Sequence, residues 1–259
     1  MSLELILGPM FAGKTSALQS IIRRHEALGI KCAVYKPISD KRYGGDFFMY
    51  THDLTKVPAY PVKYLTQQQL YEPYLLSKLI VIEEGQFFED LYDFVIKAVE
   101  KDGKHVVVGG LDGDCFRKPF GQILKLIPLA DRVTKLNSLC QGCGDGTIGL
   151  FTFRKTKSKE VVEVGGPEAY MPLCRKHYLE YTAIWNSECP RCSSGLAGSV
   201  YRPRCSVCPW SSEAEQVNDS ASSGQDGDLP TIQATLVDPP ITSLPTQTIP
   251  DICQTSQLV

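Results

Sequence analysis

The sequence contains no long hydrophobic run, no strong excess of charge of one sign and no basic leader. Apolar segments such as Leu79–Ile82 have the length of a strand, far below the roughly 18 residues that a membrane-spanning helix needs. The 27 basic and 29 acidic residues give a formal net charge of −2, which provides no argument for binding nucleic acid or a membrane surface. Met1–Gly8 has no basic region, so we expect no signal peptide and a soluble, cytoplasmic protein.

The last part of the chain lacks the residues that build a core. Residues 211–259 contain no Lys, Arg, Phe, Tyr or Trp, and they hold seven of the 29 acidic residues. They are rich in Ser, Thr, Gln, Pro and Asp. Such a segment cannot bury enough apolar surface to offset an ordering cost of about 1–2 kcal/mol per residue. The sequence therefore predicts a disordered acidic tail over 211–259.

The first half of the chain alternates between short apolar runs and segments with helical periodicity. The pattern predicts helices over 14–28 and 91–99 and strands over 3–7, 32–35, 79–82, 106–108 and 133–136. Buried strands separated by amphipathic helices indicate an α/β fold with a mostly parallel sheet and helices on both faces. Ligands of such sheets bind beyond the carboxyl ends of the strands, so the functional residues should follow the strands.

A phosphate-binding motif follows the first predicted strand and opens the first helix. It fits G-x-x-x-x-G-K-[ST] and consists of Gly8, Pro9, Met10, Phe11, Ala12, Gly13, Lys14 and Thr15. The glycines let backbone N–H groups and the helix N-terminus face phosphate oxygens. The lysine reaches the β- and γ-phosphates and the threonine hydroxyl ligates Mg²⁺. A chance glycine turn is the weaker alternative, so the motif predicts a phosphate-loop NTPase-like domain that binds ATP and Mg²⁺.

Acidic residues follow two other strands. Glu83 and Glu84 end the 79–82 strand, and their side chains should point to opposite faces because side chains alternate along a strand. One carboxylate can then serve the metal through its water shell while the other acts as a general base toward an acceptor hydroxyl. Asp40, Lys41 and Arg42 follow the second strand. An exposed acidic loop and a solvated turn are the plain alternatives for these two segments.

Cysteine and histidine spacing predicts a zinc site after the sheet. Cys140-x-x-Cys143 and Cys174-x-x-His177 are separated by strand-like segments over 148–153 and 161–164, an arrangement typical of a zinc ribbon. In a reducing compartment cysteine pairs indicate metal more often than disulfides. Three thiolates and one imidazole would form a closed tetrahedral site, which is structural in nature.

A second group of cysteines follows, formed by Cys189, Cys192, Cys205 and Cys208. Its two Cys-x-x-Cys pairs are spaced for a compact loop around a second zinc, and a set of free thiols is the alternative. We therefore divide the chain into a phosphate-loop domain (1–138), a zinc ribbon (139–185), a second zinc-binding unit (186–210) and the acidic tail (211–259).

Several spaced motifs make the chain resemble the cellular type II thymidine kinases. Beside the phosphate loop these are Asp40-Lys41-Arg42-Tyr43, Thr51-His52-Asp53, Glu84-Gly85-Gln86-Phe87-Phe88, Leu111-Asp112-Gly113 and Arg117-Lys118-Pro119-Phe120-Gly121. The resemblance continues to about Tyr178. It implies ATP-dependent phosphorylation of the 5′-hydroxyl of thymidine or deoxyuridine, in nucleotide salvage for DNA synthesis, by a homo-oligomer that is a tetramer.

The resemblance also implies roles for individual residues. Glu84 would accept the proton of the 5′-hydroxyl, with Lys14 and Arg42 at the phosphates. The ATP and Mg²⁺ site would include the phosphate loop and Asp40, Lys41, Arg42, Glu83, Glu84, Gly85 and Gln86. The base would be bound by Met10, Phe87, Phe120, Thr152 and Tyr170, under a lid with Val161, Val162, Glu163, Val164 and Gly165.

The sequence departs from the family pattern at two positions. Glu83 stands where the family has Asp, and Cys115 stands where it has an aromatic residue near the base. Either the neighbouring Phe116 replaces that contact, or the base pocket is looser. Two rival functions remain: a zinc-binding interaction protein that uses ATP as a switch, and a deoxynucleoside kinase with another base preference.

Overall fold

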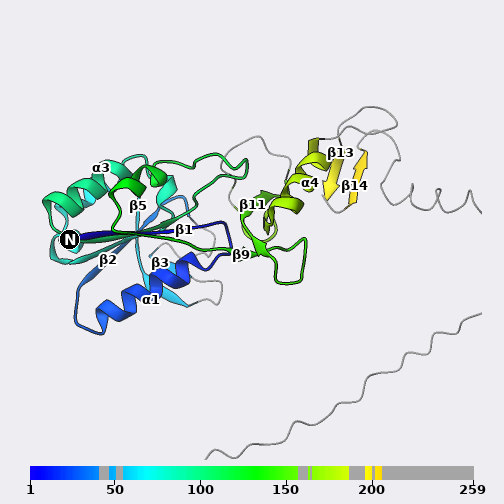
Figure 1. The fold of residues 1–259 in the computed structure, drawn as a ribbon. Coiled ribbons are helices and arrows are strands. Elements are labelled where there is room, and N and C mark those ends of the chain that lie inside the picture. The colour runs from blue at the N-terminus through cyan, green and yellow to red at the C-terminus, as the bar shows by residue number, and fades with distance from the viewer. Residues whose placement is uncertain are drawn as a thin grey trace, which may run out of the picture. The chain divides into compact units, whose positions relative to one another are not determined.

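The structure, a computed structural model, describes residues 1–40, 47–50, 55–156, 163, 165–186, 196–199 and 202–205. Six parallel strands form the central sheet in the order β5-β2-β6-β7-β1-β8 (Figure 1). In chain order they are β1 (Ser2–Leu7), β2 (Cys32–Pro37), β5 (Tyr60–Val62), β6 (Leu79–Ile82), β7 (His105–Gly110) and β8 (Arg132–Lys135). The predicted α/β fold with a mostly parallel sheet is confirmed.

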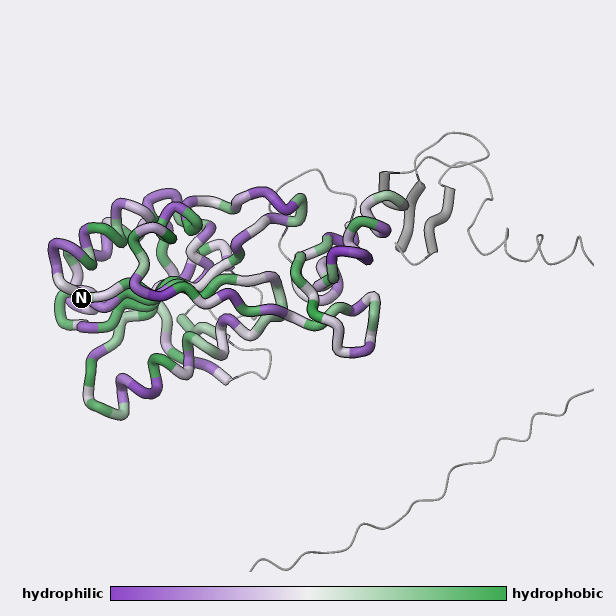
Figure 2. The backbone as a smooth tube through the Cα atoms, in the orientation of Figure 1, coloured by the Kyte–Doolittle hydropathy of each residue, from purple (hydrophilic) through white to green (hydrophobic). Residues whose placement is uncertain are grey.

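Two apolar layers cover the two faces of the sheet. Helix α1 (Lys14–Glu26) buries Leu18 and Ile22 against one face, where Ile6 of β1 also points. Helix α3 (Leu91–Ile96), which continues as a π-helical turn over Lys97–Lys101, buries Phe94 against the other face, where Leu5 points. Figure 1 shows α1 and α3 on opposite sides of the strands. Figure 2 shows α1 alternating between hydrophobic and hydrophilic residues, as expected for a helix that covers a sheet.

Short elements complete the described chain. The α/β domain also contains α2 (Glu72–Leu76), the 3-10 helices Thr66–Leu70, Gly85–Phe87 and Ile123–Leu129, and the hairpin of β3 (Phe48–Tyr50) with β4 (Lys56–Pro58). After the sheet, β9 (Ser138–Leu139) pairs with β10 (Ile148–Gly149), β11 (Phe151–Arg154) pairs with β12 (Tyr170–Leu173), and α4 (Arg175–Asn186) follows. A last antiparallel pair joins β13 (Leu196–Ser199) to β14 (Arg202–Cys205).

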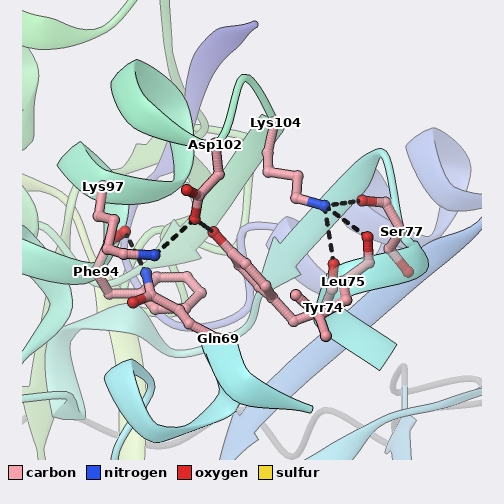
Figure 3. A network of polar contacts seen from close by, with 8 residues as sticks. All are labelled: Gln69, Tyr74, Leu75, Ser77, Phe94, Lys97, Asp102 and Lys104. Atoms are coloured by element: carbon pink, nitrogen blue, oxygen red, sulfur yellow. Dashed lines mark hydrogen bonds and ion pairs between the residues drawn. The ribbon is translucent and has the colours of Figure 1, made fainter. Parts of the chain in front are cut away.

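A network of polar contacts lies at the end of the sheet where the strands begin. Lys104 precedes β7 and donates hydrogen bonds to the carbonyls of Tyr74, Leu75 and Ser77 at the end of α2 (Figure 3). The Tyr74 hydroxyl and Lys97 both bind the Asp102 carboxylate. Lys104 thus satisfies carbonyls that a helix C-terminus leaves unpaired. This network lies at the opposite end of the strands from the phosphate loop.

Several sequence expectations differ in detail or lie outside the described residues. Helix α1 ends at Glu26, two residues before the expected end, and a turn with Gly29 at φ 71° follows. The expected strand over 148–153 is divided into β10 and β11. Of the expected strand over 161–164 only Glu163 is described, and it is in no strand. The tail over 211–259 lies outside the described residues. No helix in the described part is long and apolar enough to span a membrane.

Candidate active site and metal centre

The phosphate loop between β1 and α1 requires glycine at two points. Gly8 has φ 147°, and a Cβ there would collide with the carbonyl oxygen of Leu136. Gly13 has φ 79° and directly precedes the first residue of α1. Phe11 also adopts a left-handed conformation, with φ 64°. This curled backbone turns the N-terminus of a 13-residue helix toward the loop, which is the arrangement that binds phosphate oxygens.

Polar side chains from the start of α1 and from the end of β6 meet at the loop. The Thr15 hydroxyl donates a hydrogen bond of 2.8 Å to the Glu83 carboxylate, whose residue is only 5% exposed at the end of β6. The Lys14 ammonium donates to the carbonyl of Pro9 at 2.8 Å. A threonine hydroxyl and a carboxylate beside a phosphate loop form the oxygen-rich environment that Mg²⁺ prefers. These residues therefore fit a magnesium-nucleotide complex.

A cavity of about 700 Å³, its open mouth included, lies beside the loop. Glu84 reaches it from a left-handed backbone conformation (φ 51°, ψ 46°) that non-glycine residues rarely adopt. The cavity brings together ten residues that the sequence places at the ATP or base site, namely Met10, Asp40, Glu84, Phe87, Cys115, Phe120, Thr152, Glu163, Gly165 and Tyr170. Ser39, Leu111, Gly113 and Asp114 complete the lining.

Phe116 lies outside the lining and is 47% exposed, so Cys115 and not Phe116 faces the cavity. Lys41, Arg42, Val161, Val162 and Val164 lie outside the described residues. Sequence reasoning assigned no role to Ser39, Leu111, Gly113 or Asp114, although all four follow the ends of β2 and β7, where ligands of parallel sheets bind.

Apolar and aromatic side chains form much of the cavity wall. Phe87 and Phe120 make an edge-to-face contact with ring centroids 5.4 Å apart. Cys115 packs with Ala169 and Tyr170 in a small apolar cluster. Burial raises the pKa of the Cys115 thiol, so the side chain stays neutral at physiological pH. Such a wall suits a flat, weakly polar ring.

Hydrogen bonds join the cavity wall to the segment after the sheet. The Met10 amide of the phosphate loop donates to the Thr152 hydroxyl of β11 at 3.0 Å. The Tyr170 hydroxyl donates to the carbonyl of Glu163 at 2.7 Å and accepts from Arg154 at 3.4 Å. The buried Arg154 guanidinium lies 3.7 Å from the Glu163 carboxylate. These contacts hold Glu163 and Tyr170 at the cavity.

The four expected zinc ligands of the first group meet at one point. Cys140, Cys143, Cys174 and His177 offer ligand atoms that all lie within 4.8 Å of one another. His177 Nδ1 lies 3.3–3.5 Å from the three sulfurs, and the Cys143 and Cys174 sulfurs are 3.8 Å apart. Tetrahedral zinc with bonds of about 2.3 Å to sulfur and 2.0 Å to nitrogen places its ligand atoms about 3.5–3.8 Å apart. The cluster therefore fits one zinc ion.

Local features of the chain favour this cluster. Burial raises the pKa of Cys140, but hydrogen bonds from the Cys174 and Cys143 amides and the His177 ring outweigh it and lower the pKa to about 6. Metal binding requires that thiolate form. Gly142 leaves room for the His177 ring, because a Cβ at this position would lie 2.7 Å from it. Three cysteines of the second group lie outside the described residues, and Cys205 ends β14.

A parallel α/β sheet with a phosphate loop, a Thr15–Glu83 pair and an adjoining cavity defines a phosphate-loop nucleotide-binding protein. The comparisons with known proteins narrow this class. The family model "Thymidine kinase" matches residues 1–178. Over 182 residues the chain is 46% identical to a thymidine kinase of Oryza sativa subsp. japonica, and the match covers 69% of this chain and 66% of the rice protein.

Two further relatives give the same result. The cytosolic thymidine kinase of Homo sapiens is 39% identical over 178 residues, which cover 69% of this chain and 73% of the human protein. A thymidine kinase of Sheeppox virus (strain KS-1) is 40% identical over 177 residues, which cover 68% of this chain and 96% of the viral protein. The chain belongs to the thymidine kinase family, in its cellular type II branch.

Proposed function

We propose that the chain transfers the γ-phosphate of ATP to the 5′-hydroxyl of thymidine, and also of deoxyuridine. One observation carries the proposal: Met10 belongs to the phosphate loop and also lines the cavity, which Glu84 lines as well. A phosphate donor bound on the loop and a nucleoside bound in the cavity would therefore lie next to each other. Phosphoryl transfer depends mainly on such positioning and on charge stabilisation.

Residues of three segments would bind the triphosphate and its Mg²⁺. Lys14 and Arg42 would supply positive charge to the triphosphate. Thr15 and Glu83, joined by their 2.8 Å hydrogen bond, would hold Mg²⁺, Glu83 through the water shell of the ion. When bound, Mg²⁺ would neutralise the negative charge that develops on the phosphates during transfer. Asp40, which lines the cavity, would face the metal and phosphates from the end of β2.

The cavity would bind the nucleoside, whose 5′-hydroxyl accepts the phosphate. Glu84 would take the proton of the 5′-hydroxyl as a general base. The base would pack among the aromatic rings of Phe87, Phe120 and Tyr170, which line the cavity. Backbone groups at Glu163 and Gly165 would read the pyrimidine edge from the lid, so purine nucleosides would be rejected. Closing the cavity would exclude water, which otherwise competes as an acceptor.

The remaining units would support this reaction. The Cys140, Cys143, Cys174 and His177 cluster would bind a structural zinc next to the cavity wall. The spacing of the two Cys-x-x-Cys pairs supports a second zinc bound by Cys189, Cys192, Cys205 and Cys208. Of these four, the structure describes Cys205, which pairs with Leu196 across β13 and β14. We also propose a cytoplasmic homotetramer that serves nucleotide salvage.

The experiment is a labelled phosphate-transfer assay across thymidine, deoxyuridine, deoxycytidine and deoxyguanosine, made with the full chain and with Glu84→Gln. We expect transfer to thymidine and deoxyuridine only. Glu84→Gln should keep ATP binding and lose about 10²–10⁴-fold in kcat, the usual contribution of a general base. Glu72→Gln, on an exposed residue of α2, is the matched control and should leave kcat unchanged. A near-normal kcat for Glu84→Gln would remove Glu84 from this role.

A further inference from the structure

Gln86 is a buried polar residue that lies two positions after the proposed base. It belongs to the 3-10 helix Gly85–Phe87 and is only 3% exposed. Its side-chain amide nitrogen donates a hydrogen bond of 2.6 Å to Glu84 Oε2. Its side-chain oxygen accepts a hydrogen bond of 3.0 Å from the Leu111 amide at the end of β7. Gln86 therefore joins the Glu84 carboxylate to the backbone of the neighbouring strand.

These two partners fix the orientation of the Gln86 amide. Leu111 offers a backbone N–H, which can only donate, and an ionised Glu84 can only accept. The opposite orientation would bring two donors together at Leu111 and two acceptors together at Glu84. Space is tight as well: a Cβ at Gly110 would collide with Gln86 Oε1, and a Cβ at Gly121 would collide with the Gln86 carbonyl. The amide nitrogen is thus held toward the carboxylate.

The contact matters because of where Glu84 lies. Its backbone is in the left-handed region, at a cost of about 1–3 kcal/mol that the surroundings must offset. The hydrogen bond from Gln86 restricts the rotamer of the Glu84 side chain. A displacement of about 1 Å in an active site can reduce turnover by about 10²-fold.

We propose that Gln86 is a positioning residue that keeps the Glu84 carboxylate aimed into the cavity. The proposal rests on the proposed function, because it assumes that Glu84 is the base. A purely structural role, in which Gln86 only joins the ends of β6 and β7, is the alternative. Both roles predict a loss of stability when Gln86 is replaced, so the test must separate kcat from KM for ATP and must include a Glu84 variant.

The test compares two variants in the full chain. Gln86→Glu keeps an oxygen for the Leu111 amide but replaces the donor by a second carboxylate beside Glu84. Gln86→Met removes both hydrogen bonds. In each variant the Glu84 carboxylate loses the donor that holds its rotamer. We therefore expect kcat to fall about tenfold or more, while KM for ATP stays within about twofold.

A matched control and a double variant separate the possible outcomes. Gln69 is also buried and donates to a backbone carbonyl, that of Phe94, far from the cavity (Figure 3). Gln69→Glu should lower stability and leave kcat unchanged. In a Glu84→Gln background, Gln86→Glu should cause no further loss of kcat, because effects of residues that act through one another are not additive.

Each result decides for or against the proposal. An unchanged kcat in the folded variant, or an equal loss of kcat with and without Glu84, would overturn it and leave Gln86 a structural residue. If Gln86→Met does not fold, the kinetics of Gln86→Glu decide, since this variant keeps the Leu111 contact. Full activity of Glu84→Gln alone would instead refute the proposed function, which distinguishes the two failures.

Discussion

Removing one oxygen atom, in Tyr178→Phe, tests whether the metal centre supports the cavity. Tyr178 directly follows the proposed zinc ligand His177 in α4, is buried, and donates a 2.6 Å hydrogen bond to the carbonyl of Cys115. Cys115 lines the cavity. Burial raises the pKa of Tyr178, so its hydroxyl remains a donor at physiological pH. This contact joins the zinc-binding unit to the wall expected to hold the base.

The expected loss of unfolding free energy follows from the contacts that Tyr178→Phe leaves in place. The ring contacts with Phe151 and Phe153, at 5.3 and 5.8 Å, and the Arg117 guanidinium 4.6 Å above the ring do not need the hydroxyl. The substitution removes the hydrogen bond to the Cys115 carbonyl. Such a change costs about 1–3 kcal/mol of unfolding free energy. In a folded unit of this size, each kcal/mol lowers Tm by about 2–4 °C.

Tyr178→Phe should change the binding of the nucleoside and leave the binding of ATP unchanged. A loosened Cys115 segment weakens contacts with the base, so KM for thymidine should rise about three- to tenfold while KM for ATP stays within about twofold. Chemical denaturation gives the stability, and steady-state kinetics with each substrate varied gives the two KM values. Zinc content should remain unchanged, because Tyr178 is not a ligand.

Tyr74→Phe is the matched control. Tyr74 is equally buried, and its hydroxyl binds the Asp102 carboxylate in the network far from the cavity (Figure 3). This variant loses the same atom and a comparable free energy, about 1.5–3 kcal/mol for a bond to a charged group, but both KM values should stay unchanged. The reasoning fails if Tyr178→Phe raises KM for thymidine no more than Tyr74→Phe does.

Two further predictions concern the metal sites. Gly142→Ala should weaken zinc binding at least about tenfold in a competition with a chelator, because the added Cβ lies 2.7 Å from the His177 ring; unchanged affinity would mean that the ring moves freely. Truncation after Ser187 should lower the zinc content from two ions per chain to one and leave phosphorylation nearly intact, whereas Cys143→Ser should abolish activity. One zinc in the full-length protein would show that the second group binds none, and an inactive truncated chain would show that this unit supports the fold.

The elements that the sequence predicted are those with strong local patterns. β6 was predicted with its observed bounds because Leu79–Ile82 is a continuous apolar run between polar segments. α1 was predicted from the spacing of Leu18, Ile21 and Ile22. β5 was missed because Tyr60–Val62 is short and contains a proline, which a strand tolerates only at the edge of a sheet, where β5 lies.

The parts of the site that the sequence could not predict depend on contacts between distant residues. Met10 and Thr152 are separated by 142 positions, and Cys115 and Tyr178 by 63. No local pattern connects such pairs. The left-handed conformation of Glu84 and the orientation of the Gln86 amide likewise arise from the packing of two strand ends. Motifs therefore identified the chemistry, and the fold supplied the geometry between the motifs.

The most direct test of the central claim is to identify where the γ-phosphate of ATP goes. The full chain is incubated with γ-labelled ATP, Mg²⁺ and thymidine, and the labelled product is separated and its position of phosphorylation determined by NMR. The account predicts a thymidine monophosphate that carries the label on the 5′-oxygen, formed only when the nucleoside is present. Label found solely as inorganic phosphate, at a rate independent of thymidine, would contradict it and support a nucleotide switch instead.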